Sequence, residues 1–183
     1  MSGPGEDHIV FTIGHSNHSL EHFTRLLGKH GIGTLADVRS HPYSRYVPHF
    51  TAVPLRQALE GEGIRYVYLG RELGGRPAAR DFYDEKARVL CNRLRQSAVF
   101  AEGMSSLLVD VSNARVAVIC GEEDPLACHH WLLVGQALAE RGARCRAGLP
   151  FLKMDRIICL FRNSVQLLEE NLHGLGRKEF LMP

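Results

Sequence analysis

The sequence has no long apolar run and no export signal at its start. No segment reaches the roughly 18 uninterrupted apolar residues of a membrane span, and the first residues, MSGPGEDHIVF, lack a basic patch followed by an apolar core. The cysteines are odd in number and form no C-x-x-C pair; they stand at positions 91, 120, 128, 145 and 159. This argues against a disulfide framework and a zinc ribbon, and it favours a reducing, cytoplasmic compartment.

The chain also lacks a strong charge of either sign and a linker that would divide it. Its 22 Lys and Arg residues nearly balance 20 Asp and Glu residues, and the formal net charge is +2. A dedicated nucleic-acid binder usually has a stronger basic footprint. The composition is that of a soluble globular protein. We expect a flexible N-terminus at 1–8, one α/β domain at 9–173 and a C-terminal tail at 174–183.

What the sequence does contain is a regular alternation of strand and helix patterns. Short β-branched runs predict strands at 9–13, 34–38, 64–69 and 116–120, with a candidate fifth strand at 145–149. Helical spacing follows at 20–30, where Ser19 is the expected N-cap, and at 53–60, 82–94, 100–108 and 131–138. The alternation predicts a single-domain, Rossmann-like, three-layer α/β/α fold with a mainly parallel sheet.

Polar residues follow each of the four expected strands. In open parallel sheets, ligands bind beyond the carboxyl ends of the strands. The residues that we therefore place in one candidate site are His15, Ser16, Asp37, Arg39, Ser40, Arg71, Gly74, Gly75, Cys120, Glu122, Cys128 and His129.

The segment at 115–138 is the most informative single part of this pattern. Pro125 and the apolar spacing after Trp131 place Cys128 in the first turn of a helix. Free N–H groups and the helix dipole there favour a bound phosphate or a Cys128 thiolate. Cys128 is then the most acidic thiol of the chain and a candidate nucleophile, with His129 beside it. The alternative is that Cys128 is a small buried residue.

Arg39 comes directly after a buried strand, where an unpaired charge is costly. It requires Asp37, Glu122 or a ligand anion as its partner. Asp37 shares its strand face and either neutralises Arg39 or acts as an acid or base. His15 and Glu122 are candidates for proton transfer, although His15 could equally be a histidine that is hydrogen-bonded to the backbone.

Two loops carry further arginines. Arg45 lies among the aromatic residues of RSHPYSRYVPHF, a composition suited to phosphate binding and base stacking or to an ordinary surface loop. Arg71, Gly74 and Gly75 lie in GRELGGRPAAR, which is neither a G-x-G-x-x-G nor a P-loop pattern and is either a lid or a surface loop. The spacing of Cys120 and Cys128 is not a standard zinc-site pattern. We expect no metal site and no cofactor.

Four motifs together resemble one known family. These are TIGHSNHSLEHFTRLL, TLADVRSHPYSRYVPHF, the pattern from Leu59 through Gly75, and VICGEEDPLACHH. In this order they are similar to the domain of unknown function 488 family, over roughly residues 11–138. The resemblance supports the fold and implies no reaction. The chain departs from the family pattern at His130, where an arginine is usual, and near the fifth strand, where a His-Ile and an Asp-Gly turn are expected.

The leading hypothesis is an intracellular hydrolase or transferase that acts on an anionic small molecule, with a nucleotide as one candidate. Arg39 and Arg45 would hold the anion, and Cys128, His15, His129, Asp37 or Glu122 would carry the chemistry. One alternative is a non-catalytic module that binds nucleic acid, a less favoured partner, or protein. Another is a family member whose site has decayed. No membrane partner is expected, and the oligomeric state is open.

Overall fold

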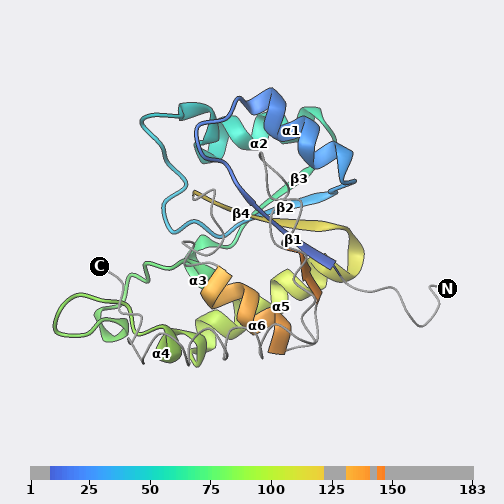
Figure 1. Ribbon diagram of the computed structural model, residues 1–183. Helices are drawn as coiled ribbons and strands as arrows, with labels where there is room; N and C mark the ends of the chain where they lie inside the picture. Colours follow the sequence, from blue (N-terminus) through green and yellow to red (C-terminus); the bar gives the residue numbers. More distant parts are fainter. Residues whose placement is uncertain (1–8, 122–130, 141–143, 147–183) are drawn as a thin grey trace, which may run out of the picture.

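A computed structural model describes residues 9–121, 131–140 and 144–146 of the chain. These residues form a parallel five-stranded sheet in the order β3-β2-β4-β1-β5 (Figure 1). The strands are β1 (Ile9–Gly14), β2 (Thr34–Asp37), β3 (Arg65–Tyr68), β4 (Val116–Cys120) and β5 (Arg144–Arg146). All four expected strands are confirmed. β5 overlaps the candidate fifth strand at Cys145 and Arg146, and the rest of that candidate, 147–149, lies outside the described residues. The domain limits at 1–8, 173 and 174–183 lie outside the described residues.

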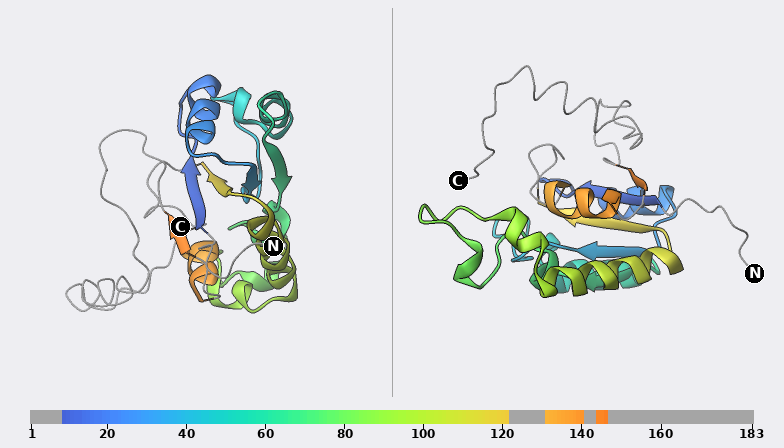
Figure 2. Two further views of the ribbon diagram at one scale, coloured as in Figure 1. Left: turned by 90° about the vertical axis from the view of Figure 1, so that its right-hand side faces the viewer. Right: turned by 90° about the horizontal axis from the view of Figure 1, so that it is seen from below.

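Helices cover both faces of the sheet (Figures 1 and 2). One face is covered by α1 (Leu20–Lys29) and α2 (Ala52–Gly61), and the short helix η1 (Pro48–Phe50) lies beside them. The other face carries α3 (Gly70–Leu73), α5 (Ala98–Asn113), the π-helical segment Trp131–Gly135 and α6 (Gln136–Glu140). The predicted three-layer α/β/α fold is confirmed.

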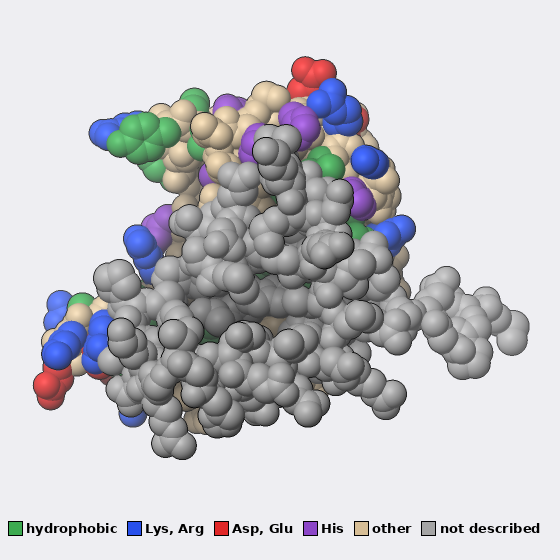
Figure 3. All heavy atoms as spheres, in the orientation of Figure 1, with side chains coloured by type: hydrophobic (Ala, Val, Ile, Leu, Met, Phe, Trp, Pro, Cys, Tyr) green, Lys and Arg blue, Asp and Glu red, His purple; other side chains and the backbone are tan. Residues whose placement is uncertain are grey.

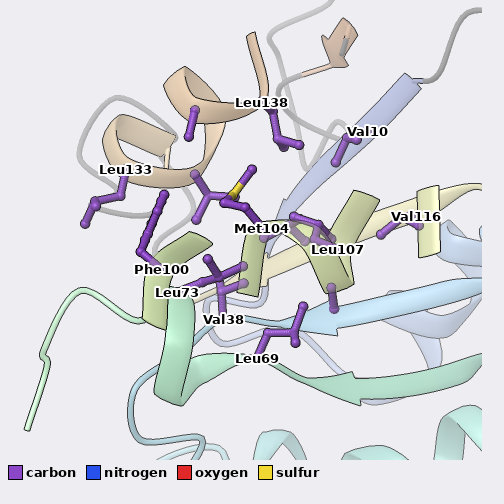
Figure 4. Close-up of a cluster of buried hydrophobic side chains, with 14 of the residues drawn as sticks. Val10, Val38, Leu69, Leu73, Phe100, Met104, Leu107, Val116, Leu133 and Leu138 are labelled. Atoms are coloured by element: carbon purple, nitrogen blue, oxygen red, sulfur yellow. The ribbon is translucent and has the colours of Figure 1, made fainter. Parts of the chain in front are cut away.

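Alternation along the strands builds two separate cores. Phe11, Ile13 and Leu35 point to the α1 and α2 side, where Phe23 and Leu55 are buried against them. The opposite core contains residues from the strands, α3, α5 and α6, and several are labelled in Figure 4: Val10, Val38, Leu73, Phe100, Met104, Leu107 and Leu138. The same alternation determines on which face of the sheet the residues just after each strand lie.

The two long helices begin where their sequence places a cap. Ser19 precedes α1 and its hydroxyl accepts a hydrogen bond from the backbone N–H of His22, as predicted. Gly31, with φ of +63°, follows the end of α1 and supplies the left-handed conformation that a C-terminal cap requires. Ser97 caps α5 in the same way by accepting from the N–H of Phe100.

The helix predicted at 82–94 is wrong for most of its length. The described chain has a 3-10 turn, η2, at Arg80–Phe82 and an α-helix, α4, only at Cys91–Arg95. Asp84 explains the difference, because its carboxylate accepts the backbone N–H groups of Lys86 and Arg88 and closes a turn instead of a helix. Tyr83 and Val89 then form an antiparallel bridge across that turn.

Glycines allow α3 to pack closely against its neighbours. A Cβ on Gly70 would lie 2.1 Å from the carbonyl oxygen of Arg39, and one on Gly74 would lie 2.4 Å from Ser40 Oγ. On the other side, a Cβ on Gly103 of α5 would lie 2.9 Å from Leu73 Cδ2. The loop after β2, α3 and α5 are thus stacked in close contact, which holds the backbone at Arg39 and Ser40 in place.

The chain leaves neighbouring strands toward opposite faces of the sheet. The connections after β1 and β2 run through α1 and α2, and those after β3 and β4 run through helices of the other face. β4 lies between β1 and β2. The carboxyl ends of the strands at such a reversal are the usual ligand position in this architecture.

Candidate functional site

An ion pair between Asp37 and Arg39 is the centre of the site. Asp37 is the last residue of β2 and is fully buried, and Arg39 is 7% exposed. Asp37 Oδ1 accepts from the Arg39 backbone N at 3.1 Å and from Arg39 Nε at 2.9 Å. Arg39 Nη2 donates to Asp37 Oδ2 at 2.5 Å. The contact is a bidentate fork, which fixes the plane of the guanidinium.

Tyr66 of β3 supplies the remaining bond to this carboxylate. Its hydroxyl donates to Asp37 Oδ2 at 2.6 Å. Burial raises the pKa of Tyr66, and the negative charge of Asp37 raises it further, so the phenol stays protonated and remains a donor. The guanidinium of Arg56 on α2 lies over the ring, with Cζ 5.2 Å from the ring centroid. Both oxygens of Asp37 are therefore occupied.

Both carboxylate oxygens of Asp37 accept hydrogen bonds, and this determines which donors of Arg39 are left without a partner in the pair. A buried ion pair is tolerated when its lone pairs and protons are satisfied. The carboxylate meets this condition, whereas Arg39 Nη1 has no hydrogen-bond partner among the described residues. Asp37 thus neutralises and orients Arg39, and the N–H donors of Nη1 have no acceptor in the part of the chain that the structure describes.

His15 follows β1 and is held by three contacts. Its backbone N–H donates to the carbonyl of Cys120 at 3.2 Å, and its ring stacks on Phe50 with 4.6 Å between centroids. Nδ1 lies 2.9 Å from the carbonyl oxygen of Ser16. Because a carbonyl only accepts, Nδ1 carries the proton, and the neutral ring presents a lone pair on Nε2. Nε2 has no hydrogen-bond partner in the described part of the chain.

The neutral form of His15 is the favoured one. Burial lowers the pKa of His15 below 6.5, and the positive charges of Arg39 and His49 lower it further. The hydrogen bond to Ser16 and the negative charge of Asp37 act in the opposite direction and are outweighed. At neutral pH, His15 Nε2 is consequently a hydrogen-bond acceptor and a base.

The strand register brings His15 and Arg39 to the two sides of Gly121. Gly14 of β1 pairs with Cys120, and Asp37 of β2 pairs with Ile119. His15 is one position beyond the first pair and Arg39 is two positions beyond the second, so the register places both level with Gly121. Gly121 is exposed, and a Cβ there would lie 3.8 Å from His15 Nε2. This nitrogen therefore lies next to Gly121, at the carboxyl edge of β4.

Phe50 and His49 of η1 form the wall behind His15. Phe50 is fully buried and meets Phe23 of α1 edge to face, with 5.0 Å between ring centroids. His49 Nε2 donates to the carbonyl of His18 at 2.9 Å and ties η1 to the turn that follows β1. Ser16 in that turn has φ of 43°, a strained value for a residue with a side chain. The turn and η1 together hold the imidazole in one orientation.

A family model described as "Domain of unknown function DUF488" matches residues 19–136, which is more than half of the chain. The chain belongs to the DUF488 family. The predicted resemblance is confirmed. The match includes Asp37, Arg39 and Tyr66 and begins after His15. No curated protein and no solved structure matches this DUF488 chain.

The structure places the other predicted site residues of the β2 and β3 loops as follows. Ser40 Oγ accepts from the backbone N–H of Arg76 at 2.9 Å, and its carbonyl accepts from the Tyr68 hydroxyl at 3.1 Å. Arg71 is exposed and its charge acts on Tyr68. Gly74 and Gly75 are buried, and Gly74 serves the close packing of α3 described above.

Arg45 lies apart from the buried pair. It is exposed, its guanidinium covers the ring of Tyr46 at 5.0 Å, and Nη2 donates to the Tyr46 hydroxyl at 2.9 Å. Glu122, Cys128 and His129 lie outside the described residues, and their roles stay predictions. Cys91 offers a contrast to the acidic thiol predicted at Cys128, because burial raises the pKa of the Cys91 thiol.

Tyr66 and Phe50 are structural parts of this site that the sequence reasoning did not identify. The sequence signal for Tyr66 is the alternation of Tyr66 and Tyr68 in β3, next to β2 in the sheet. Its contact with Asp37 depends on the strand register, which sequence alone does not give.

Among the described residues, no group of three or more His, Cys, Asp or Glu side chains is arranged to hold a metal ion. No described helix is long and apolar enough to cross a membrane.

Proposed function

We propose that this DUF488 protein is an enzyme, a hydrolase or a transferase, that binds an anionic small molecule between the carboxyl ends of β1 and β2. One observation carries the proposal: a buried arginine lies on one side of Gly121 and a neutral histidine on the other, and no described residue accepts from Arg39 Nη1 or donates to His15 Nε2. The first group binds negative charge, and the second accepts a proton.

The pair selects a particular kind of ligand. Arg39 Nη1 donates hydrogen bonds to an oxyanion, whereas the unprotonated Nε2 of His15 requires a donor, such as a hydroxyl group on the ligand or an attacking water. A phosphate monoester or a nucleotide offers both features. His15 then takes the proton of the water or alcohol as its oxygen attacks phosphorus, and Arg39 stabilises the developing charge. The bond from phosphorus to the ester oxygen breaks, and the leaving oxygen takes a proton from solvent. Cys128, if it is the nucleophile, would replace the water in this scheme.

Anion binding can be tested with the variant Arg39→Lys. An alanine at this position would leave Asp37 as a buried unpaired charge, at a cost of roughly 3–5 kcal/mol, whereas lysine keeps the charge and loses the second donor edge. We expect Arg39→Lys to weaken binding of inorganic phosphate, measured by isothermal titration, by about ten-fold or more.

Arg80→Ala is the matched control for this test, because Arg80 is an exposed arginine in the longer β3 loop. It should change the dissociation constant of phosphate by less than about five-fold. Equal losses in both variants would mean that the loop, and not the end of β2, is the anion site.

Catalysis can be separated from binding. A thermal-shift screen of nucleotides and sugar phosphates identifies ligands, because compounds that bind the native state raise its melting temperature. For a ligand that is turned over, His15→Asn should abolish turnover, since it keeps a donor to the Ser16 carbonyl and removes Nε2. Binding without turnover of every ligand found would instead favour the non-catalytic module.

A further inference from the structure

The loop between β2 and α2 ends in a tip with two exposed aromatic rings. Tyr43 is 72% exposed and Tyr46 is 83% exposed. Figure 3 shows hydrophobic and basic side chains projecting together at this tip, at the upper left of the molecule. Aromatic rings usually contribute to a core or an interface because of their large apolar area. Two exposed rings in one loop tip therefore point to a contact surface.

The tip is held rigidly by its own hydrogen bonds. At its base, the backbone N–H of Ser44 donates to Thr51 Oγ1 at 3.3 Å, and that of Val47 donates to Ser44 Oγ at 3.1 Å. The N–H of Ala52 donates to the carbonyl of Pro42 at 2.9 Å. A rigid loop loses little conformational entropy when it binds, so the exposed rings are preorganised for a partner.

Arg45 adds a cation to the same surface. Its guanidinium covers one face of the Tyr46 ring and holds the Tyr46 hydroxyl, while the ring as a whole stays exposed. The arrangement therefore presents a planar ring and a positive charge together. Single-stranded nucleic acids are bound by this combination, because bases stack on aromatic rings and arginine contacts the phosphates.

Arginines outnumber carboxylates in the segments that directly follow β2 and β3 at this edge of the sheet. Residues 38–51 and 69–80, which follow β2 and β3, contain five arginines and one carboxylate, Glu72, although acidic and basic residues nearly balance over the whole sequence. Four of these arginines are exposed: Arg45, Arg71, Arg76 and Arg80. Figure 3 shows further basic side chains along the same side of the molecule, below the tip, with acidic side chains among the lowest of them. The excess of positive charge in these two segments suits an extended polyanion.

We propose that the tip formed by Tyr43, Arg45 and Tyr46 is a stacking platform for single-stranded DNA or RNA, whose phosphates contact the exposed arginines of the β3 loop. Two exposed rings next to arginines favour this partner over an apolar protein surface, which would not require the positive charge. Single strands are favoured over duplexes because their bases are free to stack. The surface is separate from the Asp37–Arg39 pair and does not depend on the function proposed for it.

The test is fluorescence anisotropy with labelled twelve-nucleotide oligo(dT) and oligo(U) and with a duplex of the same length. We expect the wild-type protein to bind a single strand more tightly than the duplex. The logarithm of the binding constant should fall with the logarithm of the salt concentration with a slope of about −2, as for three phosphate contacts. Absence of binding at low salt, or tighter binding to the duplex, would overturn the proposal.

Variants separate stacking from simple charge attraction. Tyr43→Ala and Tyr46→Ala should each weaken single-strand binding by about five-fold to a hundred-fold, and Tyr46→Phe should restore most of it. Val53→Ala removes another exposed apolar side chain, on α2, and should have no effect. If both alanine variants bind like the wild type, the rings do not form a platform.

Phosphate binding of the same variants should stay unchanged in isothermal titration. Arg39→Lys should instead weaken phosphate binding and leave oligonucleotide binding unchanged.

Discussion

His15 shows how the surroundings of one side chain determine its chemistry. The hydrogen bond from Nδ1 to the Ser16 carbonyl selects the tautomer, and the stacking on Phe50 fixes the ring plane. Burial then holds the pKa of His15 below 6.5, with Arg39 acting in the same direction. A histidine hydrogen-bonded to backbone and a histidine that transfers protons were alternatives from the sequence. The structure shows the hydrogen bond to the backbone, and because that bond uses Nδ1, it is compatible with the proton transfer that we propose for Nε2.

The lowered pKa of His15 predicts how stability depends on pH. The unfolded chain binds a proton near pH 6.5, while folded His15 binds one only at lower pH. The contribution of His15 to stability is therefore complete above pH 6.5 and is lost as the pH falls through the folded pKa. Urea unfolding of wild type and His15→Asn at pH 7.5 and 5.5 measures this. The variant should lose less stability on acidification, and equal losses would show that His15 titrates normally.

Tyr66 should contribute to stability through Asp37. Tyr66→Phe removes a hydrogen bond to a buried carboxylate, and we expect a loss of about 1.5–3 kcal/mol in the free energy of unfolding at pH 7. Tyr68→Phe is the control, because the Tyr68 hydroxyl donates to a neutral carbonyl and should cost about 0.5–1.5 kcal/mol. Denaturant titration of both variants gives the comparison. A smaller loss for Tyr66→Phe than for Tyr68→Phe would contradict the described network.

At the scale of elements, local signals located the strands and failed in one loop. The runs at β1 to β4 are apolar and β-branched, and their burial in a parallel sheet follows from that composition. Between 82 and 94 the apolar spacing resembles that of a helix, but the Asp84 side chain competes for the backbone N–H groups. The close packing of α3 was not predictable either, because Gly70 meets a carbonyl thirty-one positions earlier in the chain, at Arg39.

Two glycines should respond in opposite directions to the same substitution. Gly70→Ala would place a Cβ 2.1 Å from the Arg39 carbonyl oxygen, so the backbone at the site must shift, and we expect a loss of about 1–3 kcal/mol. Gly28 lies in α1 with nothing within 4 Å of its Cβ position, and Gly28→Ala should gain up to about 1 kcal/mol in helix propensity. Thermal unfolding of both variants tests this. A neutral Gly70→Ala would mean that α3 and the β2 loop are loosely packed.

At the scale of the whole molecule, the arrangement of the connections creates the site. The chain runs from β1 and β2 to helices on one face and from β4 to helices on the other, so the strand order reverses at the carboxyl ends of these strands, where ligands bind in open parallel sheets. The sequence was sufficient to bring Asp37 and Arg39 together, because they are two positions apart on one strand end. The approach of His15 and the support from Tyr66 depend on the strand order, which no local pattern encodes.

The central claim is that Arg39 and His15 form one anion site. A crystal structure of the protein with arsenate at neutral pH tests it most directly, because hydrogen arsenate has both an oxyanion and a hydroxyl donor, and anomalous scattering locates the arsenic. The account predicts an arsenate beside Gly121, with an oxygen on Arg39 Nη1 and its hydroxyl on His15 Nε2. Arsenate bound only at the exposed arginines of the β3 loop, or at no position near Arg39, would contradict it.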